Sequence, residues 1–75
     1  MTIGMNIKKY RKRMGLTQDE LGKKLGIKQQ TIAMYENDKT NIKPVTLKKI
    51  ANALNVSLTD LMPELLLTDS EKKAI

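Results

Sequence analysis

Residues 18–37 read QDELGKKLGIKQQTIAMYEN, and no other part of the sequence constrains the fold as tightly. Gly22 has no side chain, so two helices can approach each other closely there, and Gly26 allows the left-handed backbone of a sharp turn. The apolar positions have the spacing of two short helices on a common core: Leu21, Leu25, Ile27, Ile32 and Tyr35. The stretch therefore predicts two helices that cross at a tight turn.

Apolar residues recur at helical spacing on both sides of this pair. A stripe on a first helix consists of Ile3, Ile7, Tyr10 and Met14. Gly15 is expected to end that helix, because glycine readily takes the left-handed conformation that follows a last turn. The core face of a fourth helix consists of Val45, Leu47, Ile50, Ala51 and Leu54. Asn55 follows this face as a left-handed cap.

Two capping boxes mark helix starts. Thr17 with Glu20 opens the second helix, and Ser57 with Asp60 opens the fifth. In each pair the hydroxyl accepts the amide three residues on, while the carboxylate reaches back. We therefore expect an all-α, compact bundle of five short helices, near residues 4–14, 17–25, 28–36, 45–54 and 57–62.

The 75 residues fit one small domain, which we place at residues 1–67, with residues 68–75 as a tail or the start of a further helix. The chain carries 14 Lys or Arg against 8 Asp or Glu, and its net charge of +6 favours a polyanionic partner. Residues 4–49 contribute +8 and residues 50–75 contribute −2. The anion-binding surface is therefore expected in the first two-thirds of the chain.

The chain has no Cys and no His. This excludes a disulfide scaffold, a thiolate nucleophile and the usual zinc ligands, and it leaves no base–nucleophile set for catalysis. We therefore expect no enzymatic activity, no cofactor, no metal and no small-molecule ligand. With no apolar run near the ~20 residues of a membrane span and no signal peptide, we expect a cytoplasmic protein. The basic first helix also lacks the Trp and Phe of a membrane-surface helix.

The sequence resembles the Cro/repressor-type helix-turn-helix regulators, the XRE family, over about residues 3–62. The resemblance rests on residues 7–18, 20–22, 32–37 and 50–58. Residues 29–32 and 36–40 look especially like the N-terminal domains of lambdoid phage repressors. It implies a lambda repressor-like DNA-binding domain of bacterial or phage origin, whose third helix enters the major groove. The chain then has double-stranded DNA as its partner.

The start of such a third helix is where base edges are read. Glutamine can pair with adenine through two hydrogen bonds, lysine can reach guanine, and a methionine can touch a thymine methyl group. The predicted base-reading residues are Lys28, Gln29, Gln30, Thr31 and Met34. Met34 departs from the polar residue of similar repressors, so the operator sequence cannot be transferred from them.

Phosphate contacts are expected around this reading helix, from helix N-termini, amides and cations. The predicted phosphate-binding residues are Arg11, Thr17, Gln18, Asn37, Lys39, Asn41 and Lys43. The resemblance also implies an ion pair between Arg11 and Glu36 that orients Arg11 toward a phosphate. Asp38 stands where similar repressors often carry Gly. It tolerates a left-handed turn, but its charge is expected to weaken DNA binding modestly.

The apolar, acidic C-terminal third is the predicted dimer surface. Its members are Leu58, Leu61, Met62, Leu65 and Leu66. A homodimer on DNA would bind a palindromic operator with half-sites ~34 Å apart, and repression is the expected mode of regulation. Two alternatives with the same fold stay open at this point: an antitoxin of a toxin–antitoxin pair and a restriction–modification controller. The neighbouring genes would distinguish them.

Overall fold

The computed structural model describes residues 1–62, which form an all-α bundle of five helices. The helices are α1 (Ile3–Arg13), α2 (Gln18–Leu25), α3 (Gln29–Glu36), α4 (Pro44–Ala53) and α5 (Leu58–Leu61). The predicted fold class is confirmed, and each predicted helix boundary lies within one residue of the observed one. The predicted tail, residues 68–75, lies outside the described residues.

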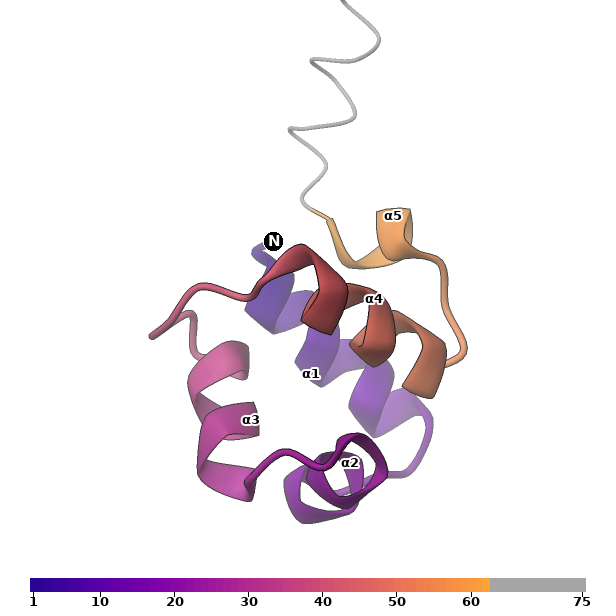
Figure 1. Cartoon of the computed structure of the whole chain (residues 1–75). Helices are drawn as coiled ribbons and strands as arrows, with labels where there is room; N and C mark the ends of the chain where they lie inside the picture. Colours follow the sequence, from indigo (N-terminus) through magenta and orange to yellow (C-terminus); the bar gives the residue numbers. More distant parts are fainter. Residues whose placement is uncertain (63–75) are drawn as a thin grey trace, which may run out of the picture.

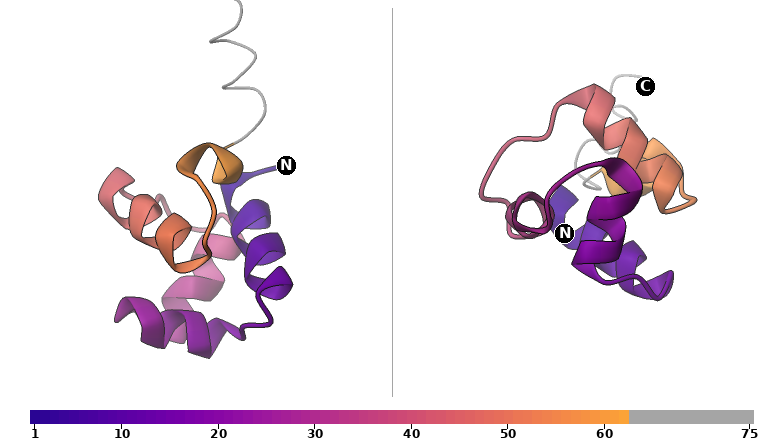
Figure 2. Two further views of the ribbon diagram at one scale, coloured as in Figure 1. Left: turned by 90° about the vertical axis from the view of Figure 1, so that its right-hand side faces the viewer. Right: turned by 60° about the horizontal axis from the view of Figure 1, so that its bottom comes forward.

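The helices surround one core, with α1 contacting both α3 and α5 (Figure 1). Helix α2 crosses below the other helices and contacts both α3 and α4. Figure 2 shows that α5 lies against the N-terminal part of α1, on the side away from α2. This arrangement leaves α2 and α3 together at one end of the bundle. No helix within residues 1–62 combines the length and the apolar character that crossing a bilayer requires.

The turn between α2 and α3 is set by two glycines. Gly26 has a φ of +69°, as its predicted left-handed role requires, and the Ile27 amide donates to the Gly22 carbonyl at 2.8 Å. A Cβ atom on Gly22 would lie 2.4 Å from the carbonyl oxygen of Ile27, a distance that real Cβ atoms essentially never show. The predicted close approach at Gly22 is therefore confirmed.

Both predicted capping boxes are present. The Glu20 amide donates to Thr17 Oγ1 at 3.1 Å, and the Thr17 amide donates to the Glu20 carboxylate at 2.8 Å. The Ser57 and Asp60 pair repeats the pattern at 3.3 and 2.9 Å. These bonds satisfy amides that have no partner inside their own helix, so capping boxes fix the starts of α2 and α5.

The core agrees with most of the predicted apolar stripes. Its fully buried side chains are Ile7, Leu21, Ile32, Ile50, Leu54 and Leu61. Tyr10 and Tyr35 are half-buried and pack against this cluster.

The prediction of a core position is wrong for two residues, Met14 and Val45. Met14 is 44% exposed because α1 ends at Arg13 and the chain turns away at Gly15, whose φ is +74°. Val45 is 61% exposed. It stands two positions before Leu47, and a separation of two places residues on different faces of a helix.

A buried hydrogen bond joins the first helix to the last. Asn6 is 7% exposed, and its Nδ2 atom donates to the carbonyl oxygen of Leu61 at 3.0 Å. Both groups would otherwise be polar atoms buried without a partner, which costs free energy. The bond therefore fixes α5 against the N-terminal half of α1.

Candidate nucleic-acid interface

The N-terminal end of α3 carries the predicted base-reading residues on an accessible surface. Lys28, Gln29 and Gln30 are exposed, and Thr31 is half-buried beside them. Met34 is 44% exposed, one helical turn further on. Ile32, on the opposite face of the same helix, is fully buried. The structure thus brings the five predicted readers together on the outer side of α3.

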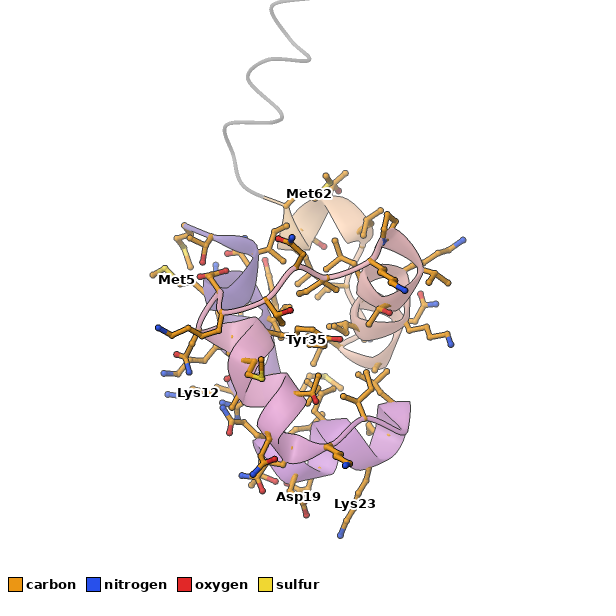
Figure 3. The ribbon with its side chains drawn as sticks, turned by 60° about the vertical axis from the view of Figure 1, so that its left-hand side comes forward. Met5, Lys12, Asp19, Lys23, Tyr35 and Met62 are labelled. Carbon is orange, nitrogen blue, oxygen red and sulfur yellow. The ribbon has the colours of Figure 1, made fainter. Side chains whose placement is uncertain are left out.

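Figure 3 views the molecule with α3 at the front. Tyr35 lies on the side of α3 that faces α4, in keeping with its contact with the core. Lys12 of α1 lies beyond the opposite edge of α3, and Asp19 and Lys23 of α2 project below it. The outer face of α3 is therefore bordered by polar side chains of α1 and α2.

A buried ion pair connects α1 to the end of α3, as the sequence resemblance implies. Arg11 Nε donates to one carboxylate oxygen of Glu36 at 2.5 Å, and Nη2 donates to the other at 3.0 Å. The side chains are 9% and 1% exposed, respectively. Nη1 also donates to the carbonyl oxygen of Leu16 at 2.7 Å, and Gln18 Nε2 donates to Glu36 at 3.1 Å. The network joins α1, the start of α2 and the end of α3.

This network changes the interpretation of two predicted phosphate contacts. Three N–H groups of Arg11 already have partners inside the protein, so only its remaining N–H groups could reach a phosphate. The amide group of Gln18 is likewise engaged with Glu36, and this residue is half-buried. Phosphate contact by Arg11 and Gln18 stays a prediction. In the structure, both side chains bind Glu36 at the C-terminal end of α3.

The other predicted phosphate-binding residues lie on the surface. Thr17 is exposed, although its hydroxyl oxygen accepts the Glu20 amide. The remaining four are exposed along the segment that leads from α3 to α4: Asn37, Lys39, Asn41 and Lys43. Lys43 is the residue before Pro44 and forms the N-cap of α4 without a side-chain capping bond. Its ammonium group is therefore not used in capping.

Two carboxylates near helix starts are held in their ionised form. The backbone amide of Thr17, and then its hydroxyl, lower the pKa of Glu20. The backbone amide of Ser57, and then its hydroxyl, lower the pKa of Asp60 in the same way. A hydrogen bond from an amide stabilises a carboxylate more than a carboxylic acid. The start of α2 therefore carries a permanent negative charge at neutral pH.

The cations of α1 partly pack on its own surface. Lys9 Nζ lies 5.2 Å, and Arg13 Cζ 5.3 Å, from the centre of the Tyr10 ring. These distances are within the range of cation–π attraction. Lys9 and Arg13 therefore both pack on the one aromatic ring of α1.

Sequence reasoning missed one connection to this surface. Asp38 has a φ of +55°, as its left-handed role predicts, but its carboxylate is engaged with the start of α1. Oδ2 accepts from Thr2 Oγ1 at 2.6 Å, and Oδ1 accepts from the Gly4 amide at 3.1 Å. A signal was present, because a Thr directly before the first periodic apolar residue is typical of an N-cap. Its link to Asp38 required the tertiary structure.

The predicted dimer surface needs a correction. Leu61 is fully buried in the core of a single chain, because α5 packs that side chain against α1 and α4. It is therefore unavailable to a second copy. Leu58 is 38% exposed and Met62 is half-buried, so both stay candidates. Leu65 and Leu66 lie outside the described residues.

The sequence of the chain is similar to those of known helix-turn-helix proteins. The sequence pattern of the helix-turn-helix family matches residues 7–61. Antitoxin HipB of Escherichia coli strain K12 is 45% identical over 53 residues, which is 71% of this chain and 60% of HipB. The matched part of this chain thus spans less than two thirds of that relative.

Two solved structures of protein–DNA complexes have the same fold. SinR, a master regulator for biofilm formation, matches with a TM-score of 0.74 and 34% identity, over 80% of this chain and 97% of SinR. The P22 c2 repressor bound to a synthetic operator matches with a TM-score of 0.77 and 27% identity, over 83% of this chain and 94% of the repressor chain.

Proposed function

The chain belongs to the Cro/repressor-type helix-turn-helix family, and from this premise we propose that it is a sequence-specific regulator that binds double-stranded DNA with α3 in the major groove. One observation carries the proposal. The outer face of α3 presents Lys28, Gln29 and Gln30 to solvent, while Ile32 on its inner face is fully buried. The helix is thus held by its apolar side and offers hydrogen-bonding groups on the other.

The chemistry of these side chains defines what α3 would read. Gln29 and Gln30 suit adenine, because its N6 amino group donates to the side-chain amide oxygen and its N7 atom accepts from the side-chain amide N–H. Lys28 suits the O6 and N7 acceptors of guanine. Met34, 44% exposed one turn on, suits a thymine methyl group. A half-site that contains A·T pairs beside a G·C pair is the expected target.

The segment between α3 and α4 would supply sequence-independent affinity. Asn37, Lys39, Asn41 and Lys43 are exposed along it and can donate to phosphate oxygens. Each lysine that neutralises a phosphate makes the slope of log affinity against log salt more negative by about 0.9. DNA binding is therefore expected to weaken steeply as salt increases.

We further propose that the regulator acts as a repressor and as a homodimer on a palindromic operator. The similarity to SinR and to the P22 c2 repressor, each in complex with DNA, supports repression by occupancy of a DNA site. Leu58 and Met62 are the described residues that would take part in pairing. The expected spacing of the half-sites is ~34 Å, one turn of DNA.

An antitoxin is a second candidate, favoured by the 45% identity to antitoxin HipB over 53 residues. In this case the protein would bind a toxin in addition to DNA. A gene for a small toxin next to this one, and a stable complex between the two purified products, would favour it. A protein that binds its operator while the neighbouring products form no complex with it would favour the simple repressor.

Selection of bound sequences from a random pool of double-stranded DNA tests the proposal directly. Parent protein should enrich one motif with two-fold symmetry. The double variant Gln29→Ala/Gln30→Ala should lose the enrichment and keep weak binding, since each pair of hydrogen bonds to a base contributes about 1–3 kcal/mol of discrimination. Lys48→Ala/Lys49→Ala, on the exposed side of α4, is the matched control and should enrich the parent motif. A glutamine variant that enriches the parent motif would refute the assignment.

A further inference from the structure

Asp38 lies between two residues of the predicted phosphate-binding segment, yet its carboxylate points to another element. Its oxygens accept from Thr2 Oγ1 at 2.6 Å and from the Gly4 amide at 3.1 Å, across 36 and 34 positions of sequence. Thr2 Oγ1 in turn accepts the Met5 amide at 3.1 Å as the N-cap of α1. We call these contacts of Asp38 with Thr2 and Gly4 the N-terminal clamp.

The clamp depends on an unusually close approach of two backbones. A Cβ atom on Gly4 would lie 2.3 Å from the Tyr35 carbonyl oxygen and 2.7 Å from that of Glu36. Only glycine allows the first turn of α1 to sit this close to the last turn of α3. The contact brings the positive end of α1 to the negative end of α3, which is electrostatically favourable.

The charge of Asp38 is used within this contact. The first turn of α1 contains no acidic residue of its own. Asp38 provides the negative charge that a helix start favours, and its two oxygens each receive a hydrogen bond from α1. The Asp38 carboxylate is therefore directed at α1 and its charge is used there. This argues against the expectation that Asp38 repels a phosphate.

The residues on either side of Asp38 are bonded to the last turn of α3. The Asn37 amide donates to Ala33 at 3.0 Å and the Lys39 amide donates to Met34 at 2.9 Å, so both neighbours continue from the end of α3 with defined backbone. Asp38 joins them at a φ of +55°, a conformation that few residues other than glycine adopt. The side-chain bonds to α1 stabilise this conformation.

We propose that Asp38 and Thr2 are positioning residues for DNA binding, which hold Asn37 and Lys39 in the orientation that meets a phosphate. The inference rests on the proposed function, because its consequence is an affinity for DNA. It reverses the effect expected from charge alone, since Asp38 would strengthen the binding of DNA.

The experiment measures operator affinity of the full chain for Asp38→Gly and Thr2→Val and for the pair together, at a temperature where circular dichroism shows each variant folded. Glycine keeps the left-handed backbone and removes the charge and both bonds, and valine removes only the hydroxyl. Thr2→Val loses one bond of the clamp and should bind about three- to tenfold more weakly, and Asp38→Gly loses both bonds and should bind at least as weakly as Thr2→Val. The double variant should bind no more weakly than Asp38→Gly, because both changes break one clamp.

Two further variants separate positioning from general loss of stability. Thr2→Ser keeps the hydroxyl and should restore parent affinity. Lys49→Gly lowers the helix propensity of α4 at an exposed position outside the proposed DNA and dimer surfaces, and it should lower stability without changing affinity. The amide resonances of Asn37 and Lys39 should shift in Thr2→Val and stay in place in Lys49→Gly.

An Asp38→Gly protein that binds the operator as tightly as the parent, or more tightly, would overturn the inference and restore the simple repulsion. Equal losses of affinity in Thr2→Val and Lys49→Gly would also overturn it. If the parent protein enriches no DNA sequence at all, the proposed function fails and this inference fails with it. The amide shifts of Thr2→Val would then still report whether the clamp itself forms.

Discussion

Replacement of Glu36 by glutamine should destabilise the protein more than almost any other change of a polar side chain. The substitution keeps the size of the side chain and removes its charge, which leaves Arg11, a residue that is 7% exposed, without a counter-ion. Removal of one partner from a buried ion pair typically costs 3–5 kcal/mol. Glutamine can still accept one hydrogen bond, so we expect a loss of about 3 kcal/mol.

That loss is large against the stability of so small a domain. A chain of 75 residues has an unfolding free energy of roughly 4–11 kcal/mol at 0.05–0.15 kcal/mol per residue. In a domain of this size each kcal/mol shifts the melting temperature by about 4–8 °C. We therefore expect Glu36→Gln to melt ~12–24 °C below the parent protein.

The assay is urea unfolding followed by circular dichroism, with the melting temperature as a second measurement. The control is Asp19→Asn, which breaks the exposed pair of Asp19 and Lys23, whose side chains are 53% and 80% exposed at a separation of 3.3 Å. Exposed pairs contribute about 0–1 kcal/mol, so this variant should resemble the parent. A loss below about 1 kcal/mol in Glu36→Gln, equal to that of the control, would refute the assignment of a structural role to the pair.

Three further outcomes follow from the packing and the helix caps. Gly22→Ala should destabilise by roughly 2 kcal/mol or more in urea unfolding, because its Cβ atom would lie 2.4 Å from the Ile27 carbonyl oxygen. Leu61→Ala should cost about 2–5 kcal/mol of unfolding free energy, independently of protein concentration, as expected for a core residue of one chain. Glu20→Gln should be less stable than the parent at neutral pH and equal to it in strong acid. The folded-state pKa of Glu20 is lowered by the amide and hydroxyl of Thr17, so its stabilisation is complete above the ordinary pKa of Glu and is lost as the pH falls through the lowered value.

Features that depend on neighbours in the sequence could be predicted closely. The box of Thr17 and Glu20 needs only residues three apart, and it forms as expected. Gly26 ends α2 in the left-handed conformation for a reason local to its own backbone. Such signals act within one turn of helix, so the sequence carries them almost completely.

Features that depend on how helices meet were harder to predict. Met14 continues the apolar spacing of α1, but the helix ends one residue before it. Met14 is therefore 44% exposed. Leu61 looked like part of a dimer surface, because the position of α5 against α1 is not encoded locally. Gly4 had no assigned purpose, since the carbonyl groups that it approaches belong to residues more than thirty positions away.

The candidate site likewise contains both local features, which could be predicted, and features that depend on the tertiary structure, which could not. The exposure of Gln29 and Gln30 followed from the period of α3, since Ile32 and Tyr35 define its inner face. Asp38 could be given the correct backbone conformation from its residue type. The direction of its carboxylate could not be foreseen, because it depends on where Thr2 and Gly4 lie in the folded chain.

The hydrogen bond between Asn6 and Leu61 has a consequence for folding during synthesis on the ribosome. Its two residues are separated by 55 positions, and at 5–20 residues per second about 3–11 s pass between their synthesis. Small helical domains fold in microseconds to milliseconds once complete. Until α5 has been synthesised, the side-chain amide of Asn6 and one side of the core therefore stay in contact with water. Translation, rather than the search for the native state, then sets the time at which this domain closes.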